Sequence, residues 1–158
     1  MRLYDYGLGT LSQYDLTAER SARTRGALLC YTEQGLLILR EFHSSEKKLK
    51  KQQELLAALI FCEAGNQPYK GQVAVGAVVL NRIKSKTYPD SMKEVIYQRG
   101  QFGPAGSGWL NRVLQNKSYT KTAWKAAADA LKGKDPINGC LYFNQGGSGK
   151  KIGDHYFH

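Results

Sequence analysis

The sequence predicts an α+β protein in which a mostly helical body carries a small antiparallel sheet. Apolar residues recur at helical spacing in several segments between residues 51 and 131, glycine and proline separate these segments, and two short β-type runs close the chain. The 158 residues correspond to about one domain, which can bury a core without metal or disulfide support.

Residues 1–50 are expected to form an N-terminal segment that contains a β-hairpin. Residues 1–25 show no clear periodicity. Apolar runs at residues 27–31 and 36–42 flank a turn that contains Gly35, which predicts the two strands of a hairpin between Gly26 and Phe42. The lysine-rich residues 44–51 predict either a linker or the polar first turns of a helix.

The predicted body, residues 51–158, begins with two helices. The first covers Lys51–Ala64 and ends at a Gly-Asn pair, after which Pro68 fits the first turn of the next helix. The second, Tyr69–Ser85, is so rich in apolar and small residues that we expect it to be buried on most sides. Further helices are expected at residues 89–98, 109–114 and 118–131, with a Gly/Pro-rich loop at 99–108.

Two strands are expected at the C-terminal end. Residues 140–143 and 152–157 have the composition of short strands, and the glycine-rich residues 145–149 connect them.

Composition excludes several classes of protein. No apolar stretch is long enough for a transmembrane helix. The three cysteines are odd in number and widely spaced, which argues against a disulfide scaffold and against a zinc site, so no metal is expected. The net charge of +10 favours a polyanionic partner, namely nucleic acid, acidic lipid or an acidic cell-wall polymer. The first residues lack an apolar secretory leader, which leaves the export route open.

Glu63 is the carboxylate that stands out. It follows the most apolar stretch of the first predicted helix and has no cation nearby in the sequence. Desolvation would raise the pKa of such a carboxyl, and a protonated acid at the mouth of a cleft is what cleavage of a glycosidic bond requires. A structural role, as a helix cap or in an ion pair, is the alternative.

Other candidates are weaker when taken alone. Polar residues adjoin aromatic ones in a way that suits sugar binding, although core packing explains the same pairs; they are Asn81-Arg82, Gln101-Phe102 and Tyr142-Phe143-Asn144. His155 lies in a predicted strand, where a hydrogen-bonded structural histidine is common. Cys62 has no partner base and is interpreted as a packing residue.

The run from Leu56 to Arg82 closely resembles the opening of the SleB/CwlJ-type cell wall hydrolases, the spore cortex-lytic enzymes. The resemblance extends over about residues 54–158, with landmarks in the same order and at similar spacing. They include Val95–Gln98, Gly100–Pro104, Gly133–Pro136, Gly139–Phe143 and Ile152–Phe157.

The resemblance implies a compact, lysozyme-like α+β catalytic domain that needs no cofactor and cleaves the glycan strands of peptidoglycan. It assigns Glu63 as the catalytic residue, acting as general acid and then as base in a lytic transglycosylase reaction that gives 1,6-anhydromuramic ends. Retaining and inverting glycosidases normally use two carboxyls, whereas a lytic transglycosylase can work with one. The side chains expected to shape the cleft or stabilise positive charge are Gln72, Asn81, Gln101, Phe102, Tyr142 and His155.

The sequence departs from the family at Asn66 and Gln67 of one motif. Where the family commonly has Glu-Ala-x-Gly-Glu-Pro, this chain has an amide, Gln67, in place of the second acid. Two alternatives therefore accompany the enzyme hypothesis: a non-catalytic peptidoglycan-binding module, and a nucleic-acid-binding protein suggested by charge alone. The enzyme hypothesis predicts peptidoglycan as partner rather than nucleic acid, and a location in the spore cortex, spore coat or cell wall.

Overall fold

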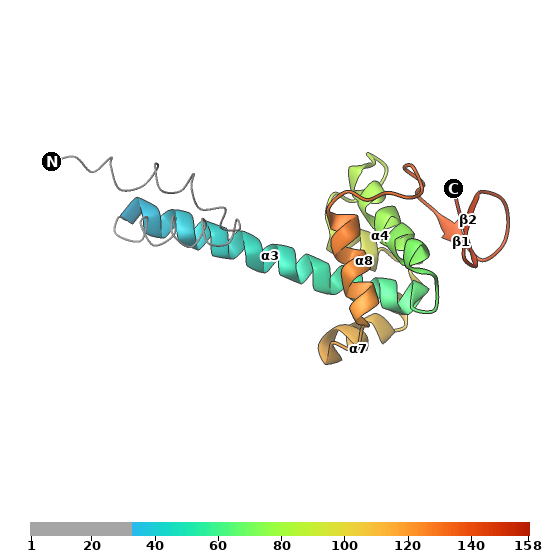
Figure 1. The fold of residues 1–158 in the computed structure, drawn as a ribbon, viewed down its shortest axis with the longest axis horizontal. Helices are drawn as coiled ribbons and strands as arrows, with labels where there is room; N and C mark the ends of the chain where they lie inside the picture. The colour runs from blue at the N-terminus through green and yellow to red at the C-terminus, as the bar shows by residue number, and fades with distance from the viewer. Residues whose placement is uncertain (1–32) are drawn as a thin grey trace, which may run out of the picture. The chain divides into compact units, whose positions relative to one another are not determined.

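The computed structural model describes residues 33–158, which are mostly helical and end in a three-stranded antiparallel sheet (Figure 1). The chain divides into two units, one ending at Lys48 and the other covering Leu49–His158. Helix α3, Glu33–Ala64, has residues in both units, and all later elements belong to the second. No helix in the described part of the chain is long and apolar enough to cross a membrane.

The predicted N-terminal hairpin is wrong in its second strand. Residues 36–42 are helical and form part of α3, while residues 27–31, the predicted first strand, lie outside the described residues. The physical reason is that the apolar run leads directly into a segment of strong helix formers (Glu, Lys, Leu and Gln) with no proline to stop the helix. A single glycine, Gly35, in the first turn does not prevent it. The helix predicted to start at Lys51 is therefore already helical at Glu33, the first residue that the structure describes.

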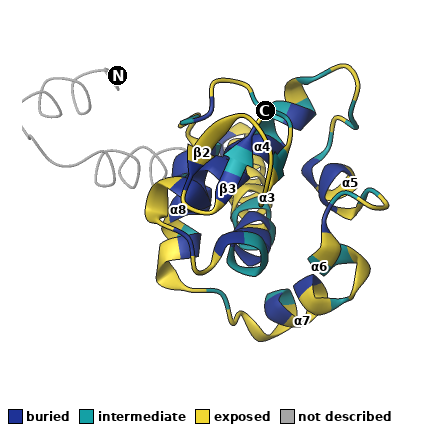
Figure 2. Ribbon diagram, turned by 90° about the vertical axis from the view of Figure 1, so that its right-hand side faces the viewer, coloured by how far each residue is buried: buried dark blue, intermediate teal, exposed yellow. Residues whose placement is uncertain are grey.

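The core of the second unit lies where α3 meets α4 (Tyr69–Lys84) and α8 (Lys121–Leu131). Helices α4 and α8 run side by side (Figure 1), and Figure 2 shows buried residues gathered along these helices and the sheet. Gly76 permits this close approach, because a Cβ there would lie 2.9 Å from Cβ of Ala130 and 3.1 Å from Cδ1 of Ile60. The second predicted helix is buried on most sides, as expected.

Three short helices follow α4. They are α5 (Met92–Tyr97), α6 (Gly103–Gly106) and α7 (Trp109–Asn116). The hydroxyl of Ser91 caps α5 by accepting a hydrogen bond from the backbone N–H of Glu94 at 3.3 Å. Helix α6 lies within the segment that was predicted as a loop, where Pro104 fits a helical first turn.

The sheet consists of β1 (Phe143–Asn144), β2 (Lys150–Ile152) and β3 (His155–Phe157), in the order β1-β3-β2 with antiparallel pairing. Residues 152–157, predicted as one strand, belong to a tight hairpin, because Gly153 adopts a left-handed conformation (φ 63°) and turns the chain. The glycine-rich segment connects two strands as expected. Beyond β1, the backbone of Tyr142 exchanges hydrogen bonds of 2.9 and 3.1 Å with His158.

Candidate functional site

Glu63 lies in the last turn of α3 and is half-buried. Burial raises the pKa of its carboxyl above the usual value. The position at a helix C-terminus acts in the same direction, since the negative end of the helix dipole disfavours an anion. Within residues 33–158 the carboxyl has no hydrogen bond or ion pair, and the last turn of α3 contains no basic residue. The alternative of a cap or ion pair is therefore not what the structure shows.

The residues beside Glu63 are also packed. The ring of Phe61 meets that of Trp109 edge-on, with centroids 6.5 Å apart, which connects the end of α3 to α7. Burial, assisted by the charge of Glu63, raises the pKa of the Cys62 thiol to about 11. A thiol with that pKa stays protonated at neutral pH, which fits the interpretation of Cys62 as a packing residue.

The turn that follows Glu63 is fixed by a buried amide. Gln67 is 6% exposed; its Oε1 accepts the backbone N–H of Asp154 at 2.9 Å, and its Nε2 donates to Oδ2 of Asp154 at 3.0 Å. Nε2 also donates to Oδ1 of Asn66 at 3.1 Å. The predicted site residue Gln72 is buried beneath this turn, where its Nε2 donates to the carbonyl of Gln67 at 3.1 Å.

Two further predicted residues, Asn81 and Gln101, are half-buried. Asn81 donates from Nδ2 to Oδ2 of Asp135 at 3.1 Å and to the carbonyl of Cys140 at 3.2 Å, which joins α4 to the segment before β1. Gln101 lies between α5 and α6, where its backbone N–H donates to the carbonyl of Gln98 at 3.1 Å.

Phe102 and Tyr142 meet around a buried arginine. The guanidinium of Arg82 lies 5.0 Å from the ring centroids of Tyr88 and Phe102 and 5.5 Å from that of Tyr142. Its Nε donates to the carbonyl of Leu141 at 2.7 Å, and burial lowers the pKa of the guanidinium, which nevertheless stays charged. Sequence reasoning did not place Tyr88 here, and no local pattern indicates that Arg82 would be the centre.

His155 belongs to the same aromatic region through Phe143. Its ring centroid lies 5.1 Å from that of Phe143, which in turn lies 6.4 Å from Phe102. His155 is 2% exposed, and burial lowers the pKa of its imidazole, so the ring is neutral at neutral pH. Its buried Nδ1 has no hydrogen-bond partner in the described part of the protein, so the predicted hydrogen-bonded role is not seen at that atom.

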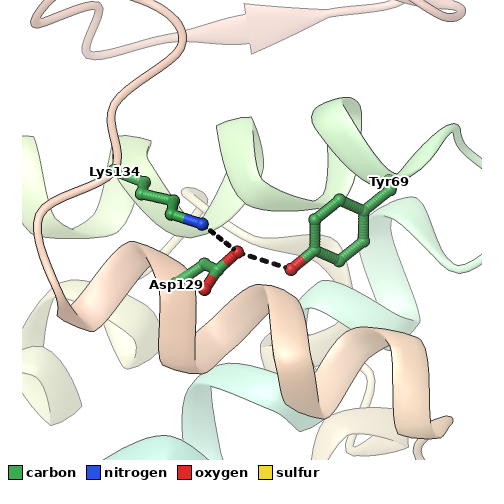
Figure 3. A network of polar contacts seen from close by, with 3 residues as sticks. All are labelled: Tyr69, Asp129 and Lys134. Atoms are coloured by element: carbon green, nitrogen blue, oxygen red, sulfur yellow. Dashed lines mark hydrogen bonds and ion pairs between the residues drawn. The ribbon is translucent and has the colours of Figure 1, made fainter.

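A polar network connects α4 with α8 (Figure 3). The hydroxyl of Tyr69 donates to Oδ2 of Asp129 at 2.7 Å, and the ammonium of Lys134 reaches the same oxygen at 2.8 Å. These two hydrogen bonds lower the pKa of Asp129, while burial and Asp129 raise the pKa of Tyr69 to about 12. Tyr69 also lines a shallow hollow with Lys121, Thr122 and Lys125. Sequence reasoning singled out none of these contacts.

The predicted residues thus fall into separate groups. Phe102, Tyr142 and His155 share one aromatic cluster, Gln72 holds the turn after Glu63, and Asn81 faces the segment before β1. Tyr142, at 47% exposed, is the most accessible of the side chains predicted to bind substrate. Among the described residues, no three His, Cys, Asp or Glu side chains gather as metal ligands would.

Comparison with known proteins gives consistent matches. The sequence model of the Cell Wall Hydrolase family matches residues 66–158, beginning just after Glu63. A spore cortex-lytic enzyme of Halalkalibacterium halodurans is 39% identical over 90 residues, which are 57% of this chain and 26% of that protein. This chain spans between 26% and 42% of the length of the curated relatives it matches.

Two solved structures are similar over the same part of the chain. The catalytic domain of the Bacillus cereus SleB protein superposes with a TM-score of 0.60 at 32% identity, covering 68% of this chain and 89% of that one. The catalytic domain of the germination-specific lytic transglycosylase SleB from Bacillus anthracis gives a TM-score of 0.59 at 32% identity, covering 68% of this chain and 93% of that one.

Proposed function

We propose that this chain, which belongs to the cell wall hydrolase family and carries a SleB-type catalytic domain, cleaves the glycan strands of spore cortex peptidoglycan as a lytic transglycosylase. The observation that carries the proposal is Glu63, a half-buried carboxyl with a raised pKa and no cation beside it in the described residues. The matched SleB structures, one of them described as a lytic transglycosylase, supply the reaction class. A lysozyme-like arrangement of the domain is part of this proposal.

Glu63 acts first as a general acid. Its protonated carboxyl gives its proton to the oxygen that joins muramic acid to N-acetylglucosamine, and the bond from C1 of muramic acid to that oxygen breaks. The carboxylate that remains accepts the proton of the C6 hydroxyl of the same muramic residue, whose oxygen then bonds to C1. The product is a 1,6-anhydromuramic end, no water is consumed, and Glu63 is protonated again.

The remaining predicted residues divide according to their exposure. Tyr142 is accessible and can pack its ring on a sugar face, and the half-buried Gln101 can offer its amide to sugar hydroxyls. Gln72, Phe102 and His155 are nearly fully buried, so we assign them to holding the walls of the cleft. No step of this reaction needs a metal or cofactor. We expect the protein to act at the spore cortex.

The test is the substitution Glu63→Gln in the full chain, assayed on purified cortex peptidoglycan by loss of turbidity and by mass spectrometry of the released muropeptides. The amide keeps the size of the side chain but cannot transfer the proton. Removing a general acid costs about 10²- to 10⁴-fold in rate. Glu46→Gln makes the same chemical change at an exposed position of the same helix and serves as the matched control.

We expect the wild type and Glu46→Gln to release anhydromuropeptides and Glu63→Gln to release none while remaining folded by circular dichroism. A folded, active Glu63→Gln variant would refute the role of Glu63. Wild-type protein that sediments with peptidoglycan but releases no products would instead indicate the non-catalytic binding module. Products that gain water rather than forming the anhydro ring would show hydrolysis by the same site.

A further inference from the structure

We propose that Gln67 is a positioning residue of this site, and that its clasp with Asp154 holds the turn carrying Glu63 against the β2–β3 turn. This rests on the proposed function of Glu63. Gln67 stands where the Glu-Ala-x-Gly-Glu-Pro pattern has its second acid, and the reaction described above gives it no role.

The clasp uses both ends of the amide. Oε1 accepts the backbone N–H of Asp154 at 2.9 Å, while Nε2 donates to Oδ2 of the same residue at 3.0 Å. The two residues are 87 positions apart, so the pair fixes one distant turn of the chain on another. Because Gln67 is 6% exposed, water has little access to its amide if these hydrogen bonds are lost, whereas Asp154 itself is exposed.

The chemistry of the clasp requires an amide at position 67. An ionised glutamate has acceptors only, so it would keep the bond from the Asp154 N–H and lose those to the Asp154 carboxylate and to Oδ1 of Asn66. It would also bring a second carboxylate, on the buried position 67, against that of the exposed Asp154, and the two would repel each other. An ionised acid at position 67 would therefore be unfavourable beside Asp154 in this chain.

The clasp is directly connected to the end of α3. The backbone N–H of Gln67 donates to the carbonyl of Ala64 at 3.0 Å, and Nε2 of Gln72 donates to the carbonyl of Gln67 at 3.1 Å. Ala64 is the last residue of α3 and follows Glu63 directly. Movement of Gln67 is therefore transmitted to the turn of helix that carries the Glu63 carboxyl.

The opposite turn is also built for this contact. A Cβ on Gly153 would lie 2.9 Å from Cδ of Pro68 and would collide with Oε1 of Gln67. Only glycine lets the β2–β3 turn come this close at a positive φ. Position 67 therefore serves geometry rather than proton transfer, which leaves Glu63 as the carboxyl that titrates in the reaction.

Exchanging the hydrogen-bond donor and acceptor between positions 67 and 154 tests the proposed role of the clasp. In Gln67→Glu the side chain loses the two hydrogen bonds that Nε2 donates, to Asp154 and to Asn66, and gains a repulsion with Asp154. In the double variant Gln67→Glu/Asp154→Asn, the new asparagine donates from Nδ2 to the new carboxylate, so the pair is restored with donor and acceptor exchanged. Asp154→Asn alone keeps an oxygen acceptor for Nε2 and should hold its Tm. The readouts are Tm, and kcat and KM on soluble cortex glycan fragments well below Tm.

We expect Gln67→Glu to lower Tm by about 5–10 °C and kcat about ten- to a hundredfold with little change in KM, and the double variant to recover most of both losses. Thr120→Ala is the matched control. It removes the hydroxyl that caps α8 at 3.1 Å from the N–H of Ala123, and so lowers Tm without touching the Gln67–Asp154 pair and without lowering kcat.

Three outcomes would overturn the proposal: an unchanged Tm in Gln67→Glu, a double variant no better than Gln67→Glu, or a loss of Tm with kcat retained, which would leave Gln67 a merely structural residue. The coupling in Tm is measurable without any activity. An inactive wild type with a restored Tm in the double variant would count against the proposed function while leaving the clasp in place.

Discussion

Gly153→Ala tests whether the β2–β3 turn must approach Gln67 closely. Gly153 has φ of 63°, so any alanine there carries left-handed strain of about 1–2 kcal/mol, partly offset by about 0.4–1 kcal/mol of lost freedom in the unfolded chain. The added Cβ would also collide with Oε1 of Gln67 and lie 2.9 Å from Cδ of Pro68. Displacing the Gln67 amide then costs a further ~1–3 kcal/mol in buried hydrogen bonding.

Gly139 provides a matched control. Its φ of 85° is also left-handed, but an added Cβ there has no atom within 4 Å. We therefore expect Gly139→Ala to lower the free energy of unfolding by about 1 kcal/mol and Gly153→Ala by about 2–4 kcal/mol. Urea unfolding followed by circular dichroism measures both. If the two variants lose equal stability, the contact between Gly153 and Gln67 contributes nothing and the reasoning fails.

Two further predictions concern Glu63 and the contact between α4 and α8. Because burial raises the pKa of Glu63, the stability that its protonated carboxyl contributes is lost as pH rises from about 4.3 through the raised value, so Glu63→Gln should gain stability relative to the wild type across that window. If the difference in free energy of unfolding between the two proteins stays constant from pH 4 to pH 8, the prediction is contradicted. Gly76→Ala places a Cβ 2.9 Å from that of Ala130, so overpacking of about 1–3 kcal/mol should exceed the helix propensity gained and lower Tm. Gly106→Ala, which has open space around its Cβ, should not lower Tm, and equal Tm values for the two variants would show that the helices separate freely.

The helical body could be predicted because each helix buries one face, and the spacing of apolar residues in the sequence indicates which face that is. The second predicted helix, at residues 69–85, matches α4 to within one residue for this reason. The hairpin prediction failed because a short apolar run has no period of its own. The run at residues 36–42 is largely exposed on α3, so its helical state depends on the helix formers that follow it rather than on burial.

The candidate site was predictable only where local sequence determines it. Glu63 stands out because its apolar neighbours precede it in the same helix, and the structure shows it half-buried with a raised pKa. The Gln67–Asp154 pair joins residues 87 positions apart, and the rings around Arg82 come from three separate segments. Such contacts depend on tertiary packing, so no motif spacing indicates them.

The environment of Glu63 follows from where α3 ends. The helix buries Leu56 to Ile60 completely, and it stops at Ala64 before the chain reaches another polar residue. The turn that follows contains no cation, and its buried amide, Gln67, has both ends bound to Asp154. The Glu63 carboxyl is therefore left beside the core, at the negative end of a helix, with its charged form disfavoured on both counts. Although the chain has a net charge of +10, no basic residue stands in the last turn of α3 to offset this, and one introduced there would lower the pKa of Glu63 again.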